Sequence, residues 1–185
     1  IYKYETLLAL YGEEKANKRW KETHNEIILQ LGKGSGKDYT STIVCTYIVY
    51  LLLCLKDPSA YYGKPSDDTI DIVNVAVNAD QAKNVFFANF VKRIRSCPWF
   101  AGKYNDTQIS IEFIKSVRVF SGHSQREAFE GLNLFLAVLD EISAFDLEST
   151  SGNIKAATAQ ATYDMYKQSV NSRFPDFGKV YLLSF

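Results

Sequence analysis

The sequence predicts an α/β fold with a mainly parallel central sheet flanked by helices. An apolar strand at residues 27–31 leads into a glycine-rich loop that stops at Lys37. Much further along the chain, the continuous apolar run Leu134–Leu139 ends in two carboxylates, Asp140 and Glu141. In parallel sheets the functional site lies at the carboxyl ends of the strands. A phosphate-type loop at one strand end and acidic residues at another therefore indicate a P-loop NTPase.

Length and composition are those of one globular domain. The chain has 185 residues, of which 46% are hydrophobic and 14% aromatic, enough for one good core. We expect a helical lead-in at residues 1–25 and a single NTPase core at residues 26–185. Twenty-one basic residues balance twenty-one acidic ones. Contact with nucleic acid would therefore need a local basic patch, because the chain has no net charge to attract it.

Cysteine usage and hydropathy favour a reducing, aqueous compartment. Cys45, Cys54 and Cys97 are odd in number and lie in apolar, helix-like contexts, which favours buried thiols over a disulfide framework. The most apolar run, residues 43–55, is short for a bilayer, so no membrane contact is expected. The chain starts without methionine and stops at Phe185 within an apolar run, which suggests a piece of a longer protein.

The glycine-rich loop is suited to binding phosphate. Gly32, Gly34 and Gly36 permit backbone angles closed to other residues, so successive N–H groups can turn toward an oxyanion at a helix start. Lys37 would supply the charge for the outer phosphates. The strict signature is not met, because the first glycine falls one place late and Asp38 stands where Ser or Thr would bind magnesium. A glycine-rich surface turn is the alternative for this stretch alone.

The segments on either side of the first strand and loop are mostly helical. Residues 2–24 predict one or two helices with a largely solvated charged face. Residues 39–55 are apolar nearly all round, which predicts a buried helix. Residues 57–68 form a polar connection, and the Ile- and Val-rich residues 70–77 predict a central strand.

A second helix and two short strands are predicted before the acidic strand. Apolar residues recur at helical spacing through residues 81–95. That helix also carries four cations, Lys83, Lys92, Arg93 and Arg95. They form either a solvated face or a contact with a phosphate backbone. Residues 108–113 and 117–120 alternate like a hairpin or two short strands, and residues 122–133 are a polar loop.

The carboxylates after the acidic strand can support metal and water chemistry. Asp140 can hold a hydrated magnesium ion. Successive strand side chains face opposite ways, so Glu141 should point elsewhere and orient or deprotonate a water beside the terminal phosphate. An exposed acidic loop start is the alternative for this pair alone. A polar loop at residues 143–153, a helix at 156–171 and a buried strand at 180–184 complete the predicted elements.

These motifs together resemble the ATPase domain of the large terminase subunits that package DNA into tailed-phage heads. The resemblance covers roughly residues 25–185. It rests on four stretches, which are Gly-Lys-Gly-Ser-Gly-Lys at 32–37, Asn-Ala-Asp-Gln-Ala at 78–82, Glu-Gly-Leu-Asn at 130–133 before Leu139-Asp140-Glu141, and Ser-Arg-Phe-Pro at 172–175 before Tyr-Leu-Leu-Ser at 181–184.

The resemblance implies an additional-strand (ASCE, RecA-like) P-loop motor that couples hydrolysis of ATP, with Mg²⁺, to translocation of double-stranded DNA into a procapsid. The implied nucleotide-binding residues are Gly32, Lys33, Gly34, Ser35, Gly36, Lys37, Asp38 and Tyr39. Lys33 matches a basic residue of the family that contacts phosphate. Ser184 corresponds to its coupling position. The implied partners are a portal protein, a small terminase subunit and further copies in a ring on the procapsid, in the host cytoplasm. The family's nuclease domain has no counterpart here.

Two departures from the family pattern concern the metal and the arginine that completes a neighbour's site. Asp38 replaces the usual Ser or Thr, and Glu130 stands where many relatives carry arginine. Arg126, in the polar loop before the acidic strand, is our candidate for the trans-acting arginine, and a salt bridge to a neighbouring glutamate is its alternative role. Arg118 lies inside a predicted strand, and Arg173 follows a predicted helix.

Two other functions stay open. Another additional-strand NTPase, such as a helicase, would need further motifs beyond Ser184. A nucleotide-responsive binding module would keep the fold while Asp38 abolished catalysis. Steady-state ATP hydrolysis with and without double-stranded DNA separates these possibilities.

Overall fold

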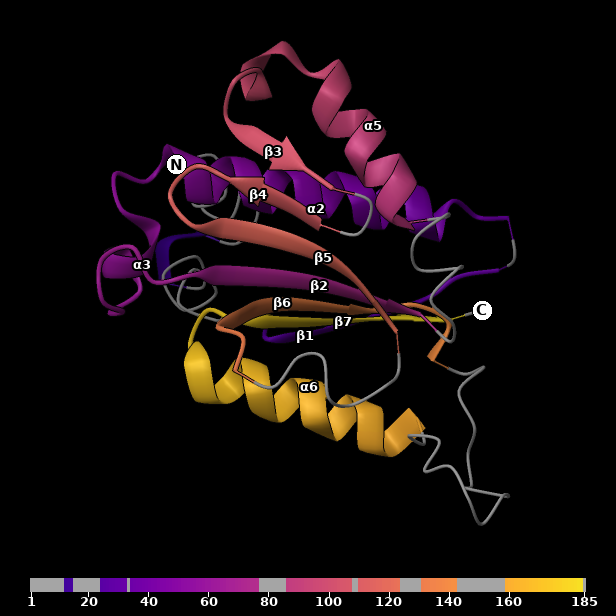
Figure 1. Cartoon of the computed structure of the whole chain (residues 1–185). Coiled ribbons are helices and arrows are strands. Elements are labelled where there is room, and N and C mark those ends of the chain that lie inside the picture. The colour runs from indigo at the N-terminus through magenta and orange to yellow at the C-terminus, as the bar shows by residue number, and fades with distance from the viewer. Residues whose placement is uncertain are drawn as a thin grey trace, which may run out of the picture.

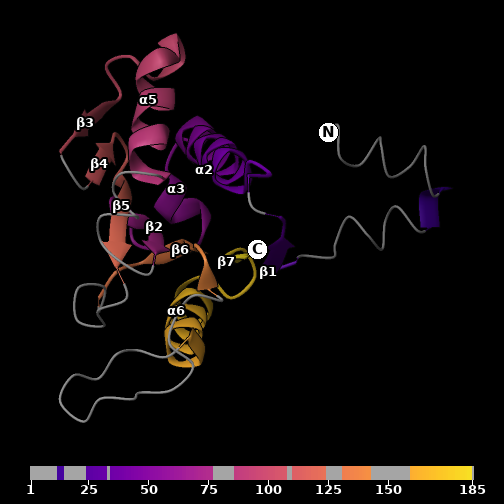
Figure 2. The same cartoon turned by 90° about the vertical axis from the view of Figure 1, so that its right-hand side faces the viewer.

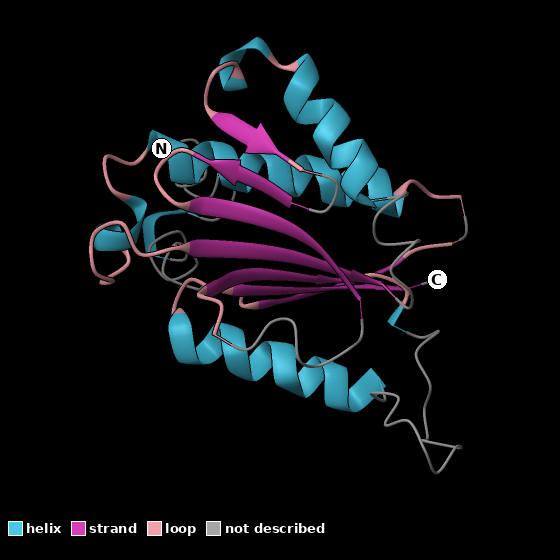
Figure 3. Cartoon of the chain, in the orientation of Figure 1, coloured by secondary structure: helices cyan, strands magenta, loops and turns pink. Residues whose placement is uncertain are grey.

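The computed structural model describes residues 12–14, 24–32, 34–76, 86–107, 110–123, 131–142 and 159–184. A central sheet lies between two helical layers, with α2 (Lys37–Cys54) and α5 (Ala88–Ser96) on one face and α6 (Ala159–Arg173) on the other (Figures 1 and 3). This arrangement confirms the predicted α/β fold with flanking helices.

Within the described residues the sheet has seven strands. They are β1 (Glu26–Gln30), β2 (Ile70–Ala76), β3 (Tyr104–Asp106), β4 (Ser110–Phe113), β5 (Val117–His123), β6 (Leu134–Leu139) and β7 (Lys179–Ser184). Their order is β1-β7-β6-β2-β5-β4-β3. The first five are parallel, and β4 and β3 extend the sheet in antiparallel fashion from β5. Strand β7 lies between the strand before the glycine loop and the strand before the carboxylates, as an additional-strand fold requires.

The two faces of the central strands supply two cores. Strands β2 and β6 are buried at every position. This explains the continuous apolar run of β6 and the Ile- and Val-rich sequence of β2, which also carries the buried polar residues Asp71 and Asn74. On one face, Ile72 packs in a cluster with residues of α2 and α5. On the other face, Val73 packs in a cluster with Tyr166 and Val170 of α6. Strand β1 alternates between exposed and half-buried residues, because it is at the edge of the described sheet.

Helix α2 begins at Lys37 and differs from the buried helix that its composition predicts. Tyr39 is 61% and Tyr47 58% exposed, and Ile43, Tyr50 and Leu51 are also exposed. Only the side that faces the sheet and α5 is buried. Hydrophobicity along one helix cannot reveal that no neighbour covers its outer side. The prediction of buried thiols is wrong in part for the same reason, since Cys54 at the end of α2 is exposed while Cys45 is buried.

Several short elements were not predicted or have other bounds than predicted. Helix α3 (Pro58–Tyr61) lies in the predicted polar connection and is capped by Asp57, whose carboxylate accepts a hydrogen bond from the Ala60 N–H at 2.9 Å. A 3₁₀ turn, η2 (Pro98–Phe100), precedes β3. Strand β5 continues to His123, so the predicted polar loop begins later than expected.

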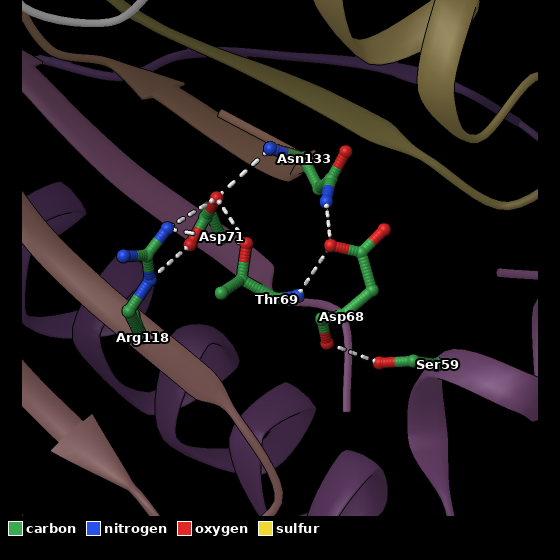
Figure 4. Close-up of polar contacts among 6 residues, drawn as sticks. All are labelled: Ser59, Asp68, Thr69, Asp71, Arg118 and Asn133. Carbon is green, nitrogen blue, oxygen red and sulfur yellow. Dashed lines mark hydrogen bonds and ion pairs between the residues drawn. The ribbon is translucent and has the colours of Figure 1, made fainter. Parts of the chain in front are cut away.

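A polar network joins three strands at the amino edge of the sheet (Figure 4). The fully buried carboxylate of Asp71, on β2, accepts bonds from Arg118 Nε at 2.7 Å and Arg118 Nη2 at 3.0 Å. It also accepts a bond from the Asn133 N–H at 2.8 Å. The Asn133 side chain donates to Asp68 at 2.8 Å. The network therefore ties the starts of β2, β5 and β6 together.

Some predicted segments lie outside the described residues. They are most of the helical lead-in, the stretch at residues 77–85, the polar loop at 124–130 and residues 143–158. None of the helices in the described part of the chain is both long and apolar enough to span a bilayer.

Candidate functional site

The glycine loop joins the carboxyl end of β1 to the start of α2. Gly34 has φ 79° and Gly36 φ 81°, in the left-handed region that glycine adopts without strain. Gly32 is not in that region; its carbonyl accepts a hydrogen bond from the Ser35 N–H at 3.1 Å. The conformational requirement for glycine is therefore met at two of the three predicted positions. Lys33 lies outside the described residues.

The start of α2 presents backbone N–H groups at the loop. Gly36 is the N-cap, and no side chain of the described residues caps this helix end. The first N–H groups of a helix have no intrahelical partner and carry the positive end of the helix dipole. Because Gly34, Ser35 and Gly36 are exposed, this end of the helix is open to an anion.

Lys37 connects the loop to the acidic strand end. Its side chain is mostly buried, and its Nζ donates to Asp140 Oδ1 at 2.8 Å and to Asp38 Oδ1 at 2.8 Å. Glu141 Oε1 lies 3.6 Å from the same nitrogen. The glycine loop and the acidic strand end, about a hundred residues apart in the sequence, thus meet at the Lys37 ammonium. This contact lies at the carboxyl edge of the sheet, which faces the viewer in Figure 2.

Burial and hydrogen bonding act in opposite directions on the pKa of Lys37 and on that of Asp140. Burial disfavours the charged form of Lys37, but hydrogen bonds from its ammonium to Asp140 and Asp38 outweigh burial, so the pKa of Lys37 lies above its usual value. Burial also raises the pKa of Asp140, and the bond from Lys37 only partly opposes this. Asp140 is therefore the buried partner of the pair, and Lys37 is the cation that opposes the effect of its burial.

Glu141 does not face away from Asp140 as the strand alternation predicts. The chain leaves β6 at Leu139, and Glu141 has φ 54°, a left-handed turn conformation. Strand alternation no longer applies after the strand has ended. Both carboxylates consequently approach Lys37, Asp140 from a buried position and Glu141 from a partly exposed one.

The residues at this edge fit the phosphates and the magnesium ion that the fold implies. Among the described residues no three His, Cys, Asp or Glu side chains form a metal site on their own. Mg²⁺ in nucleotide sites is usually held by one or two carboxylates together with phosphate oxygens and water. Asp140 would hold the ion, and the ion would supply the positive charge that draws the phosphates and neutralises them.

Two other predicted residues lie near the loop. The Arg93 guanidinium lies over the ring of Tyr39, and its Cζ atom is 4.6 Å from the centroid of that ring. Ser184 ends β7, and its carbonyl accepts a bond from the Leu31 N–H at 3.0 Å. The predicted coupling residue therefore lies beside the start of the loop, between β1 and β6. Arg126 lies outside the described residues.

Arg93 was not predicted as a neighbour of the loop. Its Nη2 donates to Thr42 on α2 at 3.3 Å, in addition to its contact with Tyr39. The sequence marked Arg93 only as one of four cations on its helix. The packing of α5 against α2 brings it here, and a contact between two helices leaves no local signal in either.

Comparison with known proteins identifies the family. The whole chain, residues 1–185, matches the family model described as the N-terminal P-loop domain of the uncharacterized protein MJ0330. The chain belongs to this family. The protein MJ0330 of Methanocaldococcus jannaschii is 32% identical over 164 residues, which cover 83% of this chain. The chain spans 27% of the length of that relative.

Solved structures of large terminases share the fold. The ATPase domain of the Thermus phage P74-26 large terminase has a TM-score of 0.61 at 13% identity, covering 97% of this chain and 66% of that one. The bacteriophage HK97 large terminase has a TM-score of 0.58 at 16% identity, covering 86% and 29%. The large terminase of another thermophilic bacteriophage has a TM-score of 0.58 at 10% identity, covering 98% and 38%. The predicted resemblance to terminase ATPase domains is confirmed for the fold.

Proposed function

We propose that this P-loop domain hydrolyses ATP and uses the energy to translocate double-stranded DNA, as the motor domain of a viral packaging terminase. The observation that carries the proposal is the contact of Lys37 with Asp140 and Glu141. It joins a phosphate-type loop to two carboxylates at one sheet edge. A glycine-rich surface turn would not need a buried lysine directed at the end of a second strand.

Each residue has a proposed role. The N–H groups of Gly34 and Gly36 bind phosphate oxygens, with Gly32, Lys33, Ser35 and Tyr39 also contacting the nucleotide. Lys37 leaves its carboxylates to neutralise the outer phosphates. Asp140 holds the magnesium ion, and Glu141 orients or deprotonates the attacking water. Ser184 couples the nucleotide state to movement, since β7 lies between the loop strand and the carboxylate strand.

The proposed setting is a ring of identical subunits on a procapsid, in the cytoplasm of an infected cell. The partners would be double-stranded DNA, a portal protein and a small terminase subunit. The support is the shared fold with three proteins whose names are large terminases. Any cutting of DNA would belong to a separate domain, because no three His, Cys, Asp or Glu side chains group as a metal site in the part of the chain that the structure describes.

A nucleotide-responsive binding module is the second candidate, and Asp38 favours it. A carboxylate in the place of the usual hydroxyl changes the charge beside the metal, and this carboxylate is hydrogen bonded to Lys37. Such a module would bind ATP and change shape without turning it over. A helicase is the third candidate, with the same site but a different DNA substrate.

The test is steady-state ATP hydrolysis by the purified chain, with and without double-stranded DNA. We expect hydrolysis that double-stranded DNA stimulates and that Lys37→Ala abolishes together with ATP binding. Lys56→Ala, which changes an exposed lysine just after α2, is the matched control and should behave as wild type. ATP binding without turnover would support the module, and stimulation by single-stranded DNA with strand separation would support a helicase. Near wild-type ATP affinity in Lys37→Ala would refute the assignment of the loop.

A further inference from the structure

The carboxylates of Asp38 and Asp140 both accept a hydrogen bond from the Lys37 ammonium. The Oδ1 atom of each side chain lies 2.8 Å from Lys37 Nζ. Asp38 is on the first turn of α2, and Asp140 follows the end of β6. Two carboxylate oxygens that share an ammonium at this distance can also share a small metal ion. We propose that Asp38 is a direct ligand of the divalent cation, and that the Lys37 ammonium and the metal compete for the same two carboxylates.

The chemistry of the donors supports a metal role for Asp38. Mg²⁺ and Mn²⁺ are hard cations that prefer carboxylate oxygens, and affinity rises with the number of charged ligands. A carboxylate at position 38 gives the ion a second negative ligand, where a Ser or Thr would give a neutral one. The Asp140 side chain is 3% exposed and the Asp38 side chain 32% exposed. One ligand is therefore fixed inside the protein, and the other can meet a hydrated ion at the surface.

A simpler role for Asp38 has different consequences. The residue lies in the first turn of α2, where the helix dipole stabilises a negative charge. If Asp38 served only this purpose, its removal would lower stability by a small amount and leave metal affinity unchanged. Metal binding must therefore be measured directly.

Competition with Lys37 links the metal to the nucleotide. Without nucleotide the ammonium occupies the space between the carboxylates and weakens metal binding. The proposed function, on which this step rests, moves Lys37 to the phosphates and frees both carboxylates. Metal and nucleotide should then strengthen each other's binding, since coupling between two ligands is reciprocal.

The experiment measures Mn²⁺ binding to the 185-residue chain by electron paramagnetic resonance, without nucleotide, at neutral pH. Asp38→Thr should lower Mn²⁺ affinity by about tenfold or more. Lys37→Ala should raise it, because the competing ammonium is gone. Asp38→Asn keeps the shape of the side chain and should weaken binding like Asp38→Thr. Asp176→Thr changes an exposed aspartate after α6, far along the chain from the site, and should leave affinity unchanged. Circular dichroism confirms that each variant is folded.

The outcomes separate this inference from the proposed function. Mn²⁺ affinity of Asp38→Thr and Asp38→Asn within about twofold of wild type would overturn the ligand assignment and leave Asp38 as a helix-end charge. Unchanged affinity in Lys37→Ala would overturn the competition. ATP binding is measured separately on the same samples. If the Mn²⁺ pattern holds while wild type fails to bind ATP, the proposed function fails and the metal site stands.

Discussion

At the scale of single residues, depth distinguishes the two carboxylates that follow β6. Asp140 is almost fully buried and hydrogen bonded to Lys37, whereas the Glu141 side chain is 28% exposed and lies 3.6 Å from the same nitrogen. A buried carboxylate is suited to holding a cation, and an accessible one can meet a water molecule. The sequence predicts the same two roles from the alternation of side chains along a strand. In the structure, the left-handed turn at Glu141, and not strand alternation, sets the position of its side chain.

Glu141→Gln should bind ATP with unchanged affinity and hydrolyse it at least about a hundredfold more slowly, because an amide cannot accept the proton of the attacking water. Phosphate release and binding of a fluorescent nucleotide measure the two effects. Glu112→Gln, an exposed change on β4, is the control and should retain wild-type turnover. Normal turnover in Glu141→Gln, with Asp146→Asn or Glu148→Gln inactive, would place the catalytic carboxylate later in the chain.

At the scale of elements, one buried carboxylate holds three strands in register at the amino edge of the sheet. Asp71 on β2 is fully buried and accepts hydrogen bonds from Arg118 at the start of β5 and from the backbone before β6. A buried charge is tolerated only when it is paired and fully hydrogen bonded. The network lies at the edge opposite Lys37. It therefore stabilises the sheet without taking part in the chemistry.

Arg118→Met should destabilise the fold by about 3 kcal/mol or more, because it leaves the Asp71 carboxylate buried without its partner. Adding Asp71→Asn should restore part of this loss by removing the charge. Urea unfolding followed by circular dichroism measures both. Arg95→Met is the matched control, since the Arg95 side chain is 62% exposed in its pair with Asp106, and exposed pairs contribute about 1 kcal/mol or less. A loss in Arg118→Met no larger than in Arg95→Met would contradict this role.

At the scale of the whole molecule, the topology decides which arginines can serve a neighbouring site. Strand β5 is parallel to β2, so its last residue, His123, lies at the same sheet edge as Asp140. Arg126 follows three residues later, within about 10 Å of chain. Arg118 is engaged by Asp71. Arg173 ends α6 just before β7 begins, at the opposite edge. Arg126 therefore stays our candidate for the arginine that completes a neighbour's site.

Arg126→Ala should make homomers that bind ATP but hydrolyse it on the order of a thousandfold more slowly, because an arginine supplied in trans stabilises the transition state. Mixing Arg126→Ala with Glu141→Gln subunits should restore activity wherever a Glu141→Gln subunit lends its arginine to an Arg126→Ala neighbour. Turnover is measured across mixing ratios, with each homomer as its own control. Full activity of the Arg126→Ala homomer would exclude Arg126 as the trans-acting arginine.

The sequence by itself determined the order of the elements and the two ends of the site. The apolar run of β6 and the Ile- and Val-rich sequence of β2 identify these strands, because strands buried on both faces are mostly apolar. The loop is recognisable because Gly34 and Gly36 adopt angles that other residues avoid. These are properties of short stretches, so they are readable without knowledge of the neighbours. The resemblance to terminase ATPase domains follows from the same stretches and their order.

Only the tertiary structure decided what each stretch contacts. The position of β7 between β1 and β6, the exposed outer side of α2 and the approach of Arg93 to Tyr39 all depend on how distant segments pack. The same holds for the ammonium shared by Asp38 and Asp140, since about a hundred residues separate these two side chains. Contacts between distant segments have no period and no fixed spacing in the chain. They arise when the sheet closes and its carboxyl edge brings the loop and the acidic strand end together.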